Sequence, residues 1–182
     1  MKLILAVVIA ACSYLQVVSA ETNVPPAQEI TGAFGVKFGT IVNLAQYTIR
    51  SKSVTGIPLY SFTPKRPLTG LTQYYFKAMP KTGQIYSIWA IGEYDNNLLC
   101  QKQQAMLLDL LKMKYGESEK QDVLGSLSDD MHTLHRGSKT ILLKRTDLGR
   151  VLYLTYTDDD LEKLAEKDHI EPGGQKVDGS GL

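Results

Sequence analysis

The sequence predicts a single α+β domain built on a mainly antiparallel sheet. Aromatic and β-branched stretches, typical of strands, occur in two groups on either side of one long helical segment. Within each group, short turns rather than helices connect neighbouring strands, which favours hairpins over parallel crossovers. With 182 residues, the chain has the length of one ordinary domain. We expect the helices to pack on one face of the sheet.

The N-terminal segment predicts export from the cell. Lys2 precedes an apolar run, and Val-Ser-Ala at 18–20 suits cleavage by a signal peptidase after Ala20. Under this interpretation residues 1–20 are a signal peptide, and the protein is periplasmic or secreted. Two alternatives stay open: a lipoprotein with its lipid on Cys12, or an uncleaved anchor, because the run nearly reaches the roughly 20 residues that span a membrane. We expect membrane contact only through such an N-terminus.

Composition divides the exported part into three segments. Residues 21–31 are polar and contain Pro25 and Pro26, so we expect an extended lead-in. Residues 32–168 hold the strand and helix patterns and form the predicted domain. Residues 169–182 are rich in glycine and polar side chains, which predicts a flexible tail.

Three glycines in residues 32–40, GAFGVKFGT, raise the question of a phosphate-binding loop. Such a loop requires a lysine directly after its last glycine, whereas Lys37 precedes Gly39. The alternation of apolar residues with others favours a strand over 34–38, and Thr40 is placed to cap a short helix. We therefore expect a structural segment and no cofactor.

The clearest predicted element is a hairpin between 73–79 and 84–94, joined by the turn-forming sequence Pro-Lys-Thr-Gly. A further strand is expected at 57–62. Alternation along the second hairpin strand predicts two sets of side chains on opposite faces. These sets are Ile85, Trp89 and Ile91 on one face, and Tyr86, Ile88 and Ala90 on the other.

Two helices complete the predicted domain. The first spans about 97–115, between the capping oxygens of Asp95-Asn96-Asn97 and the stop at Gly116. Three strands are expected after a polar passage at 117–130, namely 131–136, 139–146 and 150–157. The acidic run after Thr157 has the form of a capping box and begins a second helix at about 158–168.

Cys100, His132 and His135 are the candidate catalytic residues, because a thiol hydrolase needs a cysteine beside a histidine. A position near a helix start would lower the pKa of Cys100, whereas burial beside Leu98 and Leu99 would make it a core residue. A disulfide between two chains is a third interpretation. Residues three apart on a strand point to opposite faces, so the two histidines predict no metal site. We predict no catalytic activity from these common residue types.

Charge and aromatic content favour a protein partner. The chain has 20 basic and 19 acidic residues and no basic run interleaved with aromatics, which argues against nucleic-acid binding. Tyrosine is frequent at protein interfaces, because its ring is apolar and its tip polar. The aromatic strands, with the loop at 64–67 and the turn at 80–83, are where we expect a partner. The candidate binding residues are Tyr60, Arg66, Tyr74, Lys81, Tyr86 and Trp89.

Several stretches carry a resemblance to known proteins: FGVKFGT, TPKRP, PKTGQIYSIWA, KYG at the end of the long helix, and LYLTYTDDDLEKLAE. They resemble small secreted or periplasmic proteins of Gram-negative bacteria, most of them uncharacterised. In size, leader and α+β character the chain is similar to periplasmic immunity proteins, which block toxins delivered by neighbouring cells. The resemblance implies no catalytic residues.

The leading hypothesis is an exported binding protein that acts by protein–protein contact, as an inhibitor or toxin-immunity factor of the cell envelope. One alternative is an envelope structural or assembly protein, lipid-anchored at Cys12. Another is a thiol-dependent enzyme that uses Cys100.

Overall fold

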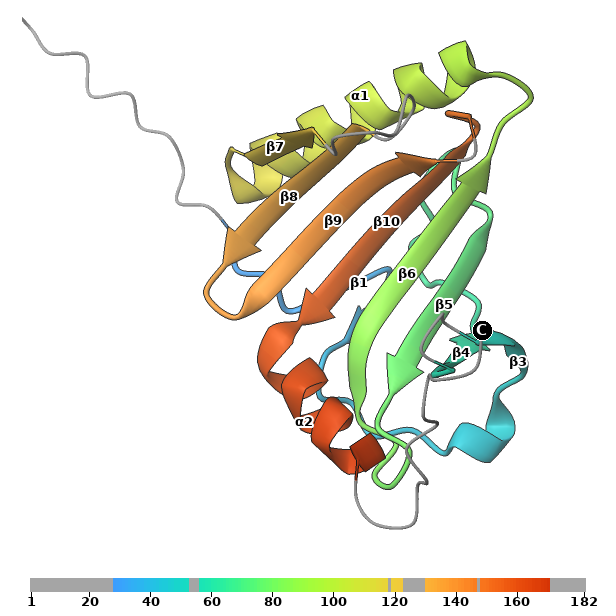
Figure 1. The fold of residues 1–182 in the computed structure, drawn as a ribbon, viewed down its shortest axis with the longest axis vertical. Coiled ribbons are helices and arrows are strands. Elements are labelled where there is room, and N and C mark those ends of the chain that lie inside the picture. The colour runs from blue at the N-terminus through green and yellow to red at the C-terminus, as the bar shows by residue number, and fades with distance from the viewer. Residues whose placement is uncertain (1–27, 53–55, 118, 123–129, 147, 171–182) are drawn as a thin grey trace, which may run out of the picture.

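The protein folds as an α+β domain, as the sequence predicts. The computed structural model describes residues 28–52, 56–117, 119–122, 130–146 and 148–170 (Figure 1). The predicted signal peptide, most of the predicted lead-in and nearly all of the predicted tail lie outside these residues. In the described part, no helix is long and apolar enough to cross a membrane.

An eight-stranded antiparallel sheet forms the centre of the domain, in the strand order β3-β4-β5-β6-β10-β9-β8-β7. Its strands are β3 (Ile49–Lys52), β4 (Pro58–Ser61), β5 (Gln73–Ala78), β6 (Ile85–Glu93), β7 (Glu119–Asp122), β8 (Asp130–Arg136), β9 (Lys139–Thr146) and β10 (Val151–Asp158). The predicted hairpin and the four other predicted strands of this sheet are confirmed. The two edge strands, β3 and β7, were not predicted, because both are short and polar.

The first predicted helix is confirmed as α1 (Asn97–Tyr115). The Asn96 side chain accepts a hydrogen bond of 3.0 Å from the backbone N–H of Leu99, which caps the start of the helix. Gly116 ends it at a φ of 85°, a conformation that glycine adopts without strain. The second helix is α2 (Asp159–Ile170), and the Asp158 carboxylate accepts from the backbone N–H of Leu161 at 3.2 Å.

The two helices pack on opposite faces of the sheet, so the expectation of a single helical face is wrong. The buried side of α1, with Cys100 and Leu107, belongs to the main core, which also contains Leu143 of β9 and Leu154 of β10. On the other face, Ala165 of α2 packs against Tyr86 and Met79 near one end of the sheet (Figure 1). The cover beside α1 comes from the N-terminal segment, whose Ile30 and Phe34 are buried in the main core.

A register shift between Lys77 and Ala78 changes the faces predicted for β6. Ile85 packs in the main core together with Ile88 and Ala90, whereas Tyr86 lies in the second cluster under α2. The prediction for Ile85 and Tyr86 is wrong because strict alternation fails at an irregularity of this kind.

The glycine segment forms a tight hairpin instead of the predicted single strand over 34–38. Strands β1 (Gly32–Ala33) and β2 (Val36–Lys37) pair through a two-residue turn. Both turn residues, Phe34 and Gly35, have positive φ, at 55° and 88°, which is the geometry of a type I′ turn.

The short helix predicted after Thr40 begins later and is capped by another residue. It is the 3₁₀ helix η1 (Leu44–Gln46), and the Asn43 side chain accepts a hydrogen bond of 3.2 Å from Ala45 N–H. The carbonyl of Thr40 instead accepts from the backbone N–H of Ile85 at 2.9 Å. This segment is therefore fixed to the main sheet by its backbone.

Candidate binding face of the sheet

One face of the central strands carries α2 at one end and no other described helix or strand (Figure 1). Antiparallel register places its side chains in three transverse rows across β5, β6, β10, β9 and β8. We call this set the open face. The rows are Gln73, Ile91, Tyr153, Lys144 and Met131; Tyr75, Trp89, Thr155, Leu142 and Thr133; and Lys77, Ser87, Thr157, Thr140 and His135.

Large apolar side chains remain half-buried on the open face. They include Tyr75, Trp89, Ile91, Tyr153 and Leu142, while the small Thr155 is buried among them. Alternation on strands places these residues opposite the core, so the same strands that fill the core also display this surface. Half-exposed aromatic rings on a rigid sheet offer contact area at a small cost in conformational entropy.

Hydrogen bonds hold the polar parts of these rings. Trp89 Nε1 donates to Ser87 Oγ at 2.8 Å, and Ser87 Oγ lies 3.1 Å from Thr157 Oγ1. Tyr75 donates its hydroxyl to Gln73 Oε1 at 2.7 Å, and Gln73 Nε2 donates to Glu93 Oε1 at 2.8 Å. Two short networks therefore orient the two central aromatic side chains before any partner arrives.

Charged groups lie at the α2 end of the open face. Lys77 Nζ lies 4.8 Å from the centre of the Trp89 ring, within the range of a cation–π interaction. Burial lowers the pKa of Lys77, and the nearby carboxylate of Glu162 acts in the opposite direction. Burial also raises the pKa of Glu162, against the attraction of Lys77. The partly desolvated pair connects α2 to the aromatic centre of the face.

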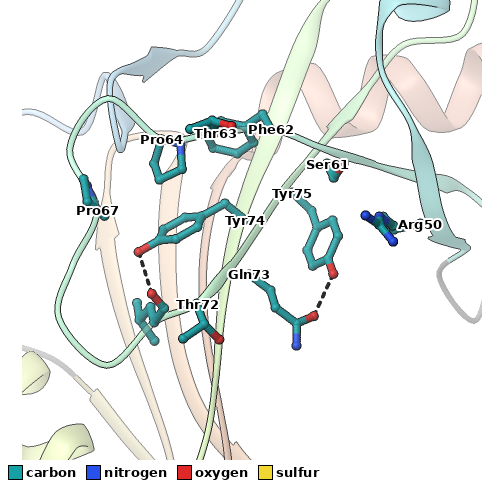
Figure 2. Close-up of a pocket in the computed structure, with 11 residues that line it drawn as sticks. Arg50, Ser61, Phe62, Thr63, Pro64, Pro67, Thr72, Gln73, Tyr74 and Tyr75 are labelled. Atoms are coloured by element: carbon teal, nitrogen blue, oxygen red, sulfur yellow. Dashed lines mark hydrogen bonds between the residues drawn. The ribbon is translucent and has the colours of Figure 1, made fainter.

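A pocket of about 680 Å³ adjoins the open face at Gln73 and Tyr75. Figure 2 shows that Tyr74 and Tyr75 point to different sides of β5, and that Arg50 of β3 lies on the Tyr75 side. The Tyr74 hydroxyl donates to the Leu71 carbonyl at 3.0 Å, so this ring forms a fixed wall. The remaining lining residues are Ser61, Phe62, Thr63, Pro64, Pro67, Leu71 and Thr72.

The structure does not bring the six candidate binding residues together. Trp89 is at the centre of the open face and Tyr74 lines the adjoining pocket, whereas the Tyr60 ring is buried and stacks on Phe76 at 5.5 Å. Tyr86 is buried beneath α2, where burial and the charge of Glu162 raise its pKa.

The two basic candidates lie elsewhere on the surface. Arg66 is exposed and lines a pocket beside the β1–β2 hairpin. Lys81 is exposed in the turn between β5 and β6, and its Nζ lies 3.8 Å from a carboxylate oxygen of Asp168. The neighbours that surround Trp89, namely Tyr75, Ile91 and Tyr153, were not among the candidate binding residues, although Ile91 was predicted to share a face with Trp89. The sequence contains a signal for two of them. Tyr75 lies opposite Trp89 in the register of the predicted hairpin, and Ile91 follows Trp89 by two residues on the same strand.

The catalytic candidates occupy separate environments. Cys100 is fully buried in the main core, and burial raises the pKa of its thiol despite the opposing charge of Arg145. A raised pKa disfavours the reactive thiolate. His132 is opposite Leu143 and His135 opposite Thr140 in the β8–β9 register, so the prediction that the histidines face opposite ways is confirmed. Among the described residues, no three metal-binding side chains cluster.

Comparison with known proteins finds no relative of the chain. No family model, curated protein or solved structure matches the chain.

Proposed function

We propose that the protein is an exported binding protein whose open face holds a protein partner, as an inhibitor or toxin-immunity factor of the cell envelope. One observation carries this proposal: the middle row of the open face presents Tyr75 and Trp89 side by side, with Leu142 beyond the small, buried Thr155, and no described helix covers them. Contiguous apolar side chains with a polar rim are typical of protein-interaction surfaces.

The rim of the open face supports selective recognition. Glu93 lies next to Gln73 at one end of the face, while Lys77 and Glu162 lie at the α2 end. Charged groups around an apolar centre favour complementary partners over others and fix their orientation. The fold thus provides a preorganised surface of mixed character, which suits contact with a protein.

Affinity capture with a matched pair of variants tests the proposal. The protein, Trp89→Ser and Leu148→Ser are each used to capture partners from Gram-negative envelope extract supplemented with toxins of competing strains. Leu148 is an exposed leucine, 77 % accessible, in the β9–β10 turn. We expect a partner bound by the protein and by Leu148→Ser, with affinity lowered about tenfold or more by Trp89→Ser.

The outcome is decisive in both directions. A captured protein that binds Trp89→Ser as tightly as wild type would show that the partner uses another surface. Failure to capture any reproducible partner would exclude the proposal in this form. Thermal unfolding of each variant shows that the fold is retained.

A further inference from the structure

The outer side of α1 carries an apolar stripe. Leu99, Met106, Leu110 and Met113 are exposed by 46 %, 43 %, 44 % and 73 %. Their spacing of seven, four and three residues places them along one line of the helix, about 21 Å long. We call these four residues the α1 stripe. It lies on the side of α1 away from the core residues Leu107 and Leu111.

We propose that the α1 stripe is the interface of a homodimer, in which α1 packs antiparallel against α1 of a second copy. This interface is separate from the open face and independent of the proposed function. An interface with two-fold symmetry must be self-complementary, because the same patch meets itself in reverse order. The α1 stripe meets this requirement: with a two-fold axis close to Met106, Leu99 lies opposite Met113 of the second copy.

Flanking charges support the same register. Lys102 and Asp109 are both exposed, and helical spacing puts them on the same side of the α1 stripe. In an antiparallel pair of helices, this side of one helix faces the same side of the other. Lys102 then lies opposite Asp109 of the second copy, and the symmetry repeats the pair. Both the apolar and the charged positions therefore match an identical helix running the other way.

The contact area between the two α1 helices limits the expected affinity of the dimer. One helix from each copy buries less surface than a standard protein–protein interface. We therefore expect a dimer that dissociates in the micromolar range. Exchange between monomer and dimer should be visible by sedimentation velocity over a concentration series.

Charge reversal provides the principal test, with Leu148→Lys as the control for an exposed apolar residue outside the α1 stripe. Lys102→Asp and Asp109→Lys are each expected to weaken dimerisation about fivefold or more, and the double variant is expected to restore it. Met106→Lys should abolish the dimer, whereas Leu148→Lys should leave it unchanged. Because these side chains are exposed, the variants are expected to fold, which thermal unfolding checks.

Cross-linking identifies what covers the α1 stripe. In the full chain with Cys12→Ser, Met106→Cys adds an exposed thiol, while Cys100 is buried. Dimerisation across α1 predicts a covalent dimer with a short bis-maleimide. A monomer whose new thiol is protected would place a segment of the same chain on the α1 stripe and overturn the proposal. A monomer with a reactive thiol at all concentrations would also overturn it, as would a dimer insensitive to Met106→Lys.

Discussion

The ammonium nitrogen of Lys77 lies 4.8 Å from the centre of the Trp89 ring, and this contact joins the second helix to the open face. Glu162 of α2 favours the charged form of Lys77 against the effect of burial. The position of α2 therefore affects the aromatic residue at the centre of the proposed binding surface.

Acrylamide quenching of tryptophan fluorescence tests the cover that Lys77 gives to Trp89. Because Trp89 is the only tryptophan, the emission reports on this one site. Lys77→Ala removes the side chain above the ring, so we expect a larger quenching constant. Lys81→Ala, which removes an exposed lysine of the neighbouring turn, is the control and should not change it. Equal quenching of wild type and Lys77→Ala would contradict the contact.

Glu162→Gln should change how stability depends on pH. The pKa of Glu162 is raised above 4.5 in the folded protein, first by burial. The folded state thus binds more protons than the unfolded state above about pH 4.5, so this group lowers stability as the pH rises through its folded pKa. We expect the free energy of unfolding of Glu162→Gln to increase relative to wild type between pH 4.5 and neutrality.

Urea unfolding at a series of pH values measures this difference. A constant difference between Glu162→Gln and wild type across the series would show that the carboxyl of Glu162 has the same pKa in the folded and unfolded states.

A matched pair of glycine substitutions separates backbone strain from steric overlap. Gly83 and Gly137 have φ values of 70° and 58°, so alanine is strained at both positions, by about 1–2 kcal/mol. At Gly83 the added Cβ would also overlap the carbonyl oxygen of Val42, whereas at Gly137 it meets no atom within 4 Å.

We therefore expect Gly83→Ala to lower the free energy of unfolding by at least about 1 kcal/mol more than Gly137→Ala. Chemical denaturation of both variants measures the two costs. Equal costs would mean that the segment at Val42 moves away freely from the β5–β6 turn.

Cys100 should be unreactive in the folded protein. Its side chain is fully buried, and burial raises the pKa of the thiol. In a Cys12→Ser background, we expect a thiol reagent to label Cys100 rapidly in denaturant and only at the rate of opening in native buffer. Rapid labelling in native buffer would instead support the thiol-dependent alternative.

The elements predicted correctly have local signals. The β5–β6 hairpin has a turn sequence between two aromatic strands, and α1 has a capping asparagine and a terminal glycine. The β1–β2 turn lacks such a signal, because an aromatic residue rarely adopts the positive φ of Phe34. Burial and edge-to-face contacts with Tyr74 and Tyr156, at 5.1 and 5.7 Å, stabilise it there.

The candidate site was only partly predictable. The aromatic content of the strands identifies Trp89, and hairpin register identifies Tyr75 and Ile91 as its neighbours. Tyr153 joins them only because β10 pairs with β6, two strands that are far apart in the chain. A pairing between distant segments has no short-range signal, so the width of the open face could not be read from the sequence.

By itself, the sequence determined the fold class, both helices and most of the strands, because hydrogen bonding and side-chain alternation within short segments specify them. Only the tertiary structure decided which face each helix covers and which side chains share the open face. The N-terminal segment occupies the space beside α1, so α2 packs on the other face near Tyr86. These choices depend on competition between distant segments for the same apolar surface, which no local pattern records.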